Sequence, residues 1–148
     1  TSAHRASLDE LVVVTGSVDL SELLPRETTL IKNERWREGQ STSLQVAVDH
    51  CRHVGHQALV VGLADMPGVP SSAWKAVASS NSPLATATFT GQRRPPVKLG
   101  REVWDQLPDS GDQGARTLLT SGVWCTLEVP CDGRGDDIDT VEDLQKWT

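Results

Sequence analysis

The chain has 148 residues, enough for one domain with a hydrophobic core, and its 37% hydrophobic and 23% charged residues are typical of globular proteins. A net charge of −6 argues against non-specific nucleic-acid binding, and no segment is apolar enough to span a membrane. The cysteines Cys51, Cys125 and Cys131 lack C-x-x-C spacing, so we expect neither a disulfide framework nor a zinc knuckle, and a cytoplasmic location.

Strands and helices are predicted to alternate along the chain. In chain order we expect strands over 11–15 and 29–31, a helix from Ser41 or Thr42 to Gly55, a strand over 58–64, a helix over 70–78 and a strand over 84–90. There follow a strand over 95–99, helices over 101–107 and 114–120, a strand over 123–129 and a helix that starts at Thr140 and carries Leu144 and Trp147.

This alternation predicts a three-layer α/β fold with a mostly parallel sheet and antiparallel edge strands. We place 95–99 at an edge, because Pro95 and Pro96 cannot donate to a central ladder. The unbroken apolar run 58–64 predicts a central strand buried on both faces. Asp65 then lies at the carboxyl end of this strand, the edge at which open α/β sheets bind ligands.

Asp65 and Asp139 both lie at predicted transitions from strand to helix, so they can meet over one edge of the sheet. Such a pair suits Mg²⁺, which takes one or two protein carboxylates and completes its shell with water and phosphate oxygens. Alternatively, Asp139 is a favourable charge at a helix N-terminus and Asp65 caps a turn. The spacing of the two acids leaves both interpretations open.

Histidines and a cysteine near the end of the helix 41–55 suggest a second metal site, of zinc. The candidate ligands are His50, Cys51, His53 and His56. Cys51, however, falls on the apolar stripe of the helix and the histidines fall off it. We therefore favour a solvated helix end over a zinc site.

Four motifs span most of the chain. They are Asn33-Glu-Arg-Trp36-Arg-Glu-Gly39-Gln-Ser41-Thr-Ser43-Leu44, Leu63-Ala-Asp65-Met-Pro67, Gly111-Asp112-Gln-Gly114-Ala-Arg116 and Asp137-Ile-Asp139-Thr-Val-Glu-Asp143-Leu144. With these motifs in this order, the chain resembles the MobA-like nucleotidyltransferase superfamily. Within it, the resemblance is closest to the molybdenum-cofactor cytidylyltransferase branch.

The resemblance implies a single Rossmann-like nucleotidyltransferase domain over residues 1–148. Such an enzyme transfers a nucleotidyl group, here CMP from CTP, to a phosphorylated acceptor such as molybdopterin or the molybdenum cofactor and releases pyrophosphate. Asp65 and Asp139 would bind the catalytic Mg²⁺ or Mn²⁺. The segment near the base and ribose would include Gly39, Gln40, Ser41 and Ser43. Neither a nucleic acid nor a membrane is an expected partner.

The chain departs from this family at two places. The family begins with a strand and a glycine-rich phosphate loop, and no such loop precedes Leu11. We expect either that the protein has lost this unit or that the natural chain carries it upstream of Thr1.

The second departure is Arg93-Arg-Pro-Pro-Val-Lys98, where many relatives have Gly-His-Pro before the valine. Arg93, Arg94 and Lys98 are candidates to contact an anionic acceptor, with a merely solvated loop as the alternative. Two other functions stay open: a non-catalytic nucleotide- or partner-binding module of the same fold, and a transferase for another nucleotide, such as GTP, or another acceptor.

Overall fold

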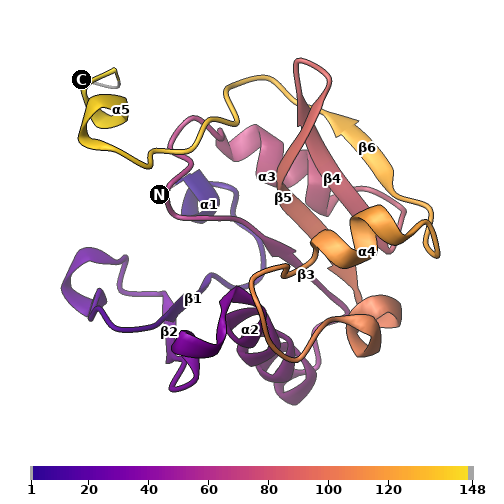
Figure 1. Ribbon diagram of the computed structural model, residues 1–148, viewed down its shortest axis with the longest axis horizontal. Coiled ribbons are helices and arrows are strands. Elements are labelled where there is room, and N and C mark those ends of the chain that lie inside the picture. Colours follow the sequence, from indigo (N-terminus) through magenta and orange to yellow (C-terminus); the bar gives the residue numbers. More distant parts are fainter. Residues whose placement is uncertain (1, 147–148) are drawn as a thin grey trace.

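The computed structural model describes residues 2–146, whose strands form two sheets (Figure 1). The first sheet is a parallel pair, β1 (Val12–Thr15) and β2 (Thr29–Lys32). The second has the order β3-β5-β4-β6, and its strands are β3 (Ala58–Val61), β5 (Gln92–Gly100), β4 (Leu84–Phe89) and β6 (Leu127–Pro130). The predicted α/β class is confirmed, with the strands divided between two sheets.

Helices connect and cover these strands. The α-helices are α1 (Ser2–Arg5), α2 (Gln40–Val54), α3 (Ser71–Ala78), α4 (Arg116–Ser121) and α5 (Val141–Gln145). Three short 3₁₀ helices are η1 (Ser21–Leu23), η2 (Trp36–Glu38) and η3 (Arg101–Gln106). Because α2 contacts both β1 and β3, it joins the two sheets. None of the helices in the described part of the chain is long and apolar enough to cross a membrane.

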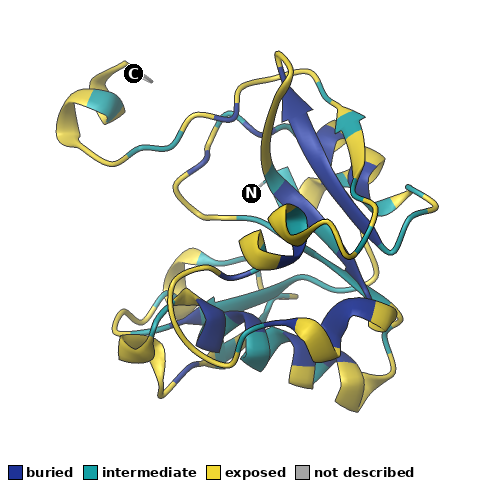
Figure 2. Cartoon of the chain, turned by 45° about the vertical axis from the view of Figure 1, so that its right-hand side comes forward, coloured by how far each residue is buried: buried dark blue, intermediate teal, exposed yellow. Residues whose placement is uncertain are grey.

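The most deeply buried strand is β4, not the apolar run after Gln57. All six residues of β4 are buried (Figure 2), whereas all four residues of β3 are only partly buried. The prediction of a central strand over 58–64 is therefore wrong in position. Within residues 2–146, β3 pairs with β5 alone and lies at the edge of its sheet, which leaves part of its apolar surface uncovered.

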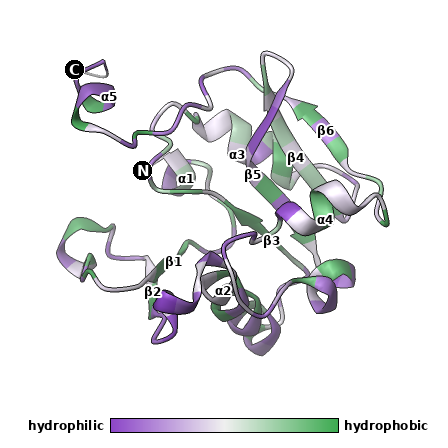
Figure 3. Ribbon diagram, viewed as in Figure 1, coloured by the Kyte–Doolittle hydropathy of each residue, from purple (hydrophilic) through white to green (hydrophobic). Residues whose placement is uncertain are grey.

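Strand β5 is interior, although an edge position was predicted for its prolines. It pairs antiparallel with β3 on one side and with β4 on the other. Opposite it, Thr86 pairs with Val97 but the next residue of β4 pairs with Arg94, so Pro95 and Pro96 fall in a bulge. A bulge leaves its extra residues outside the ladder, which is why this strand tolerates residues that lack an N–H. Figure 3 shows β5 turning from hydrophilic to hydrophobic along its length.

The ends of two helices test the capping predictions. Helix α2 begins after Gly39 and not after Ser41 or Thr42, while Gly55 ends it in the left-handed conformation as expected. Thr140 forms the predicted capping box at the start of α5, a helix with no buried residues that stands apart from the sheets (Figure 1). Trp147, which we expected on this helix, lies outside the described residues.

Candidate functional site

The segment 131–139 returns from β6 toward the loop that follows β3. Three backbone hydrogen bonds hold it there: Cys131 N–H donates to the carbonyl of Thr88 (2.9 Å), Arg134 N–H to Gly68 (3.0 Å) and Ile138 N–H to Asp65 (2.8 Å). Ile138 stands between Asp137 and Asp139 in the sequence. The bond to the backbone of Asp65 therefore brings acids from two distant motifs together, as the sequence predicted for Asp65 and Asp139.

The surroundings of Asp65 disfavour its negative charge. Partial loss of hydration raises the pKa of Asp65, and the nearby carboxylates of Asp137 and Asp139 raise it further. Arg94 supplies a counter-charge to these acids, with its Nη1 3.8 Å from Oδ2 of Asp137. We call Asp65, Asp137 and Asp139 the acid cluster. A divalent cation placed among them would relieve the repulsion.

The donor set of the acid cluster fits a magnesium or manganese ion. Its carboxylate oxygens are hard ligands, and Mg²⁺ binds to proteins through one or two such groups while phosphate and water complete its octahedron. Within residues 2–146, no group of three or more His, Cys, Asp or Glu side chains is arranged to hold a metal ion by itself, and this includes the three acids of the cluster. The cluster therefore suits a metal that arrives with phosphate oxygens.

Sequence reasoning named Asp65 and Asp139 and did not name Asp137 as part of the pair. The signal for Asp137 was the run of acids that contains Asp139. The fold shows that, of these two acids, Asp137 has the larger effect in raising the pKa of Asp65.

The loop at the start of α2 packs against a second loop, 111–114. Gly39 has φ of 109°, and a Cβ there would lie 2.3 Å from the carbonyl oxygen of Gly111, so only glycine fits. Ser41 N–H donates to Gly111 O (2.9 Å), and Ser41 Oγ accepts from Gly114 N–H (3.0 Å). Two of the resembling motifs therefore meet here in one interlocked structure.

Predicted nucleotide-binding residues differ in their freedom to contact a ligand. Ser41 is fully buried and holds the 111–114 loop, and Ser43 accepts a hydrogen bond from Asn33 Nδ2 (2.9 Å). Gln40 is exposed, and its backbone N–H donates to Asp112 Oδ1 (3.1 Å). Among the described residues, no hydrogen bond or ion pair joins this loop to the acid cluster. The Gln40 side chain is the one placed to reach a ligand.

The three candidate cations for the acceptor point to different partners. Arg93 Nε donates to Glu128 Oε1 (2.7 Å) and its Nη1 to the carbonyl of Leu119 (3.3 Å). Lys98 Nζ donates to the carbonyl of Ser80. Arg94 faces the acid cluster through Asp137. Of the three, Arg94 is the one that contacts the acid cluster.

Two of the three histidines of the zinc alternative, His50 and His56, contact an acid that sequence reasoning did not consider. Nε2 of His50 lies 2.9 Å from Glu10 Oε2, and Nε2 of His56 lies 2.8 Å from Glu10 Oε1. Thr29 Oγ1 donates to the same carboxylate (2.6 Å). We call these four residues the Glu10 cluster. Cys51 is buried in the hydrophobic core, so the predicted zinc ligands do not converge.

Comparison with known proteins identifies a family and a fold for this chain. The model of the MobA-like NTP transferase domain matches residues 1–126. No curated protein matches the chain. The similar solved structures include two of Rv0371c and one of a nucleotidyl transferase. Rv0371c from Mycobacterium tuberculosis H37Rv superposes with a TM-score of 0.85 and 23% identity, over 99% of this chain and 78% of that one.

Rv0371c in complex with manganese gives a TM-score of 0.79 and 22% identity, over 98% of this chain and 81% of that one. A nucleotidyl transferase from Methanothermobacter thermautotroptrophicus (Mth528) gives 0.79 and 20% identity, over 99% of this chain and 74% of that one. At such identities these structures establish the fold. The family model covers most of the sequence, and this chain therefore belongs to the MobA-like NTP transferase family.

Proposed function

We propose that this protein transfers a nucleotidyl group, CMP from CTP, to a phosphorylated acceptor such as the molybdenum cofactor, with release of pyrophosphate. The observation that carries the proposal is the convergence of Asp65, Asp137 and Asp139, held together by the hydrogen bond from Ile138 to Asp65. Membership of an NTP transferase family supplies the nucleoside triphosphate as donor.

Asp65 and Asp139 are the proposed ligands of a divalent metal, and the similar Rv0371c forms a complex with manganese. Held there, Mg²⁺ or Mn²⁺ would supply positive charge against the negative charge that develops during phosphoryl-type transfer. In such transfer the protein mainly positions the reacting groups. Asp137 adds negative charge that strengthens attraction of a cation.

The remaining positioning falls to the loops around the acid cluster. We propose that the segment with Gly39, Gln40, Ser41 and Ser43 lies along the base and ribose, because its hydrogen bonds to the 111–114 loop hold it in one conformation. Gln40 offers an exposed side chain there. Arg94 is the proposed contact for the anionic acceptor, since it lies beside Asp137.

Pyrophosphate release by the full-length protein tests this function. With Mn²⁺, molybdenum cofactor and each nucleoside triphosphate in turn, we expect turnover with CTP. Asp65→Asn should lower it by about 100-fold or more, because one of two charged metal ligands is lost. The matched control Asp49→Asn changes only an exposed ion pair with Arg52, so its turnover should stay within about twofold of wild type.

Substantial turnover by Asp65→Asn would overturn the assignment of the metal site. A strong preference for GTP would contradict the cytidylyl part of the proposal and leave the transferase reaction standing. Binding of a nucleotide with no pyrophosphate release from any of the four would favour the non-catalytic binding module instead.

A further inference from the structure

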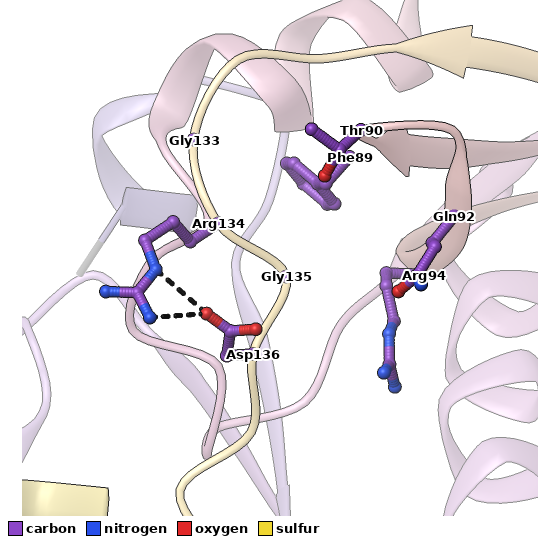
Figure 4. A pocket seen from close by; sticks show the side chains of 8 residues that line it. All are labelled: Phe89, Thr90, Gln92, Arg94, Gly133, Arg134, Gly135 and Asp136. Atoms are coloured by element: carbon purple, nitrogen blue, oxygen red, sulfur yellow. Dashed lines mark hydrogen bonds and ion pairs between the residues drawn. The ribbon is translucent and has the colours of Figure 1, made fainter.

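A small pocket lies next to the acid cluster. It has a volume of about 160 Å³ and opens between the β4–β5 turn and the segment 133–136 (Figure 4). The turn is Thr90–Gly91, and both residues have positive φ, as tight hairpins require. Arg94 and Gln92 of β5 form one wall, and the segment that leads to Asp137 forms the other.

Gly135 lets the two walls approach each other. A Cβ at this position would lie 2.8 Å from Cδ2 of Phe89 and 2.9 Å from Cγ of Arg94. The backbone of Gly135 is therefore in direct contact with the aliphatic stem of Arg94. This packing fixes the root of the Arg94 side chain, which lines the pocket and is 43% exposed.

The two arginines that line the pocket form ion pairs of different closeness. Arg134 and Asp136 on the far wall form a close ion pair of 2.7 Å (Figure 4). Arg94 on the near wall has a looser one, 3.8 Å to Asp137, between two partly exposed side chains. A loose pair of this kind contributes little energy. An anion in the pocket can therefore compete with Asp137 for the guanidinium of Arg94 at small cost.

The size of the pocket limits what can enter it. Small-molecule sites usually measure roughly 300–1,000 Å³, so a pocket of about 160 Å³ holds one end of a ligand and not a whole nucleotide or cofactor. Arginine binds phosphate in a bidentate manner, through parallel N–H donors. A phosphate group therefore fits the size of this pocket, and Arg94, the lining cation without a close ion pair, is the donor suited to it.

We propose that this pocket binds the phosphate group of the acceptor, with Arg94 as the residue that recognises it. The inference rests on the proposed nucleotidyl transfer, since it assigns the acceptor's end of that same site. It also separates Arg94 from Arg93 and Lys98, whose side chains are engaged with Glu128 and Ser80. The acceptor is accordingly a phosphate monoester whose phosphate lies beside the acid cluster.

The first test uses inorganic phosphate as the probe, without nucleotide. Its binding is monitored by NMR of the backbone amides and the arginine side chains of the protein. We expect phosphate to shift the signals of Gly133, Gly135 and Arg94 Nε–H. Arg94→Ala should weaken phosphate binding by about tenfold or more, because a charge-assisted contact is lost, and Arg94→Lys should restore part of it. Preserved dispersion of the other amide signals confirms that each variant is folded.

The matched control is Arg101→Ala. Arg101 is exposed and follows the opposite end of β5, seven residues along the strand and so roughly 20 Å from Arg94. Its removal should change phosphate affinity by less than about twofold. If Arg94→Ala, Arg93→Ala and Arg101→Ala lose the same amount of phosphate affinity, phosphate binding depends on the overall charge of the protein alone. This result would overturn the proposal.

Titration with CTP in the presence of Mn²⁺ distinguishes the acceptor's phosphate from the phosphates of the nucleotide. Phosphate that stays bound at Gly133 and Gly135 when CTP is present supports an acceptor subsite. Displacement by CTP would assign the pocket to the triphosphate and overturn the proposal. Because these measurements need no turnover, failure of the pocket and failure of the proposed reaction give different results.

Discussion

Two groups of ionisable side chains in this protein hold a carboxylate in opposite ways. In the Glu10 cluster, hydrogen bonds from Thr29, His56 and His50 outweigh partial burial and lower the pKa of Glu10 to about 2. In the acid cluster, lost hydration and two further acids raise the pKa of Asp65. Glu10 thus has its partners within the protein, while Asp65 is surrounded by groups that repel its charge.

The difference separates a structural contact from a candidate ligand site. Glu10 precedes β1, His50 lies on α2 and Thr29 on β2, so their hydrogen bonds fasten the N-terminal segment to both elements. Repulsion between the carboxylates of the acid cluster has no such structural benefit. Their close placement becomes favourable only when a cation neutralises them, and this pattern is expected of a functional site. From sequence alone, Asp65 with Asp139 was a candidate magnesium site, and His50 and His56 belonged to a zinc alternative that we did not favour.

Binding of Mn²⁺ should give the largest contrast between the two clusters. At 100 times its dissociation constant, a ligand that binds only the native state raises the free energy of unfolding by about 2.7 kcal/mol. We expect this gain in wild type and in Glu10→Gln, and its near-complete loss in Asp65→Asn. Urea unfolding with and without Mn²⁺ measures it. Loss of the gain in Glu10→Gln, with retention in Asp65→Asn, would reverse the assignment of the two clusters.

Glu10→Gln should lower the free energy of unfolding by about 2 kcal/mol at neutral pH, because charge-assisted hydrogen bonds to a partly buried carboxylate are lost. The pKa of Glu10 is lower in the folded protein, about 2, than its ordinary 4.5. Its stabilisation is therefore complete above pH 4.5 and disappears as the pH falls toward 2.

Urea unfolding of Glu10→Gln between pH 3 and 7 checks this dependence, with Glu22→Gln as the exposed control. We expect the gap between wild type and Glu10→Gln to narrow on acidification, and Glu22→Gln to track wild type throughout. A gap that does not change with pH would show that the substitution acts through packing and not through the charge of Glu10.

Local patterns in the sequence predicted the local features of the fold. The apolar spacing from Leu44 to Cys51 and the position of Gly55 located α2, and the spacing of Thr140 and Asp143 predicted a capping box that the structure confirms. The meeting of Asp65 with the segment of Asp139 was also predictable. It needed only the rule that ligand sites form where strands give way to loops.

Features set by distant pairing were not predictable from one sequence. The prolines of β5 favoured an edge strand, because prolines lack the N–H that a central ladder needs. No local sequence pattern predicts the bulge in which Pro95 and Pro96 lie. Glu10 was overlooked because His50 and His56 are 40 and 46 residues away along the chain. The apolar run of β3 likewise indicated a strand without indicating which strands would flank it.

The smallest predicted effect is that of Asp65→Asn on the free energy of unfolding without metal, and it is opposite in sign to that of Glu10→Gln. Because the pKa of Asp65 is raised in the folded protein, the ionised carboxylate destabilises it at neutral pH, and this penalty fades as the pH falls through the raised pKa toward the ordinary 3.8. Without metal, Asp65→Asn should therefore be slightly more stable than wild type at pH 7, by less than about 1 kcal/mol since solvent screens the exposed side chain.

Urea unfolding in metal-free buffer at pH 7 and pH 4, each at low and high salt, measures this difference. Both acid and salt should shrink it, because the first removes the charge of Asp65 and the second screens Asp137 and Asp139. If Asp65→Asn is instead less stable than wild type at pH 7, the carboxylate of Asp65 is a structural partner like Glu10. The contrast between the two clusters would then be lost.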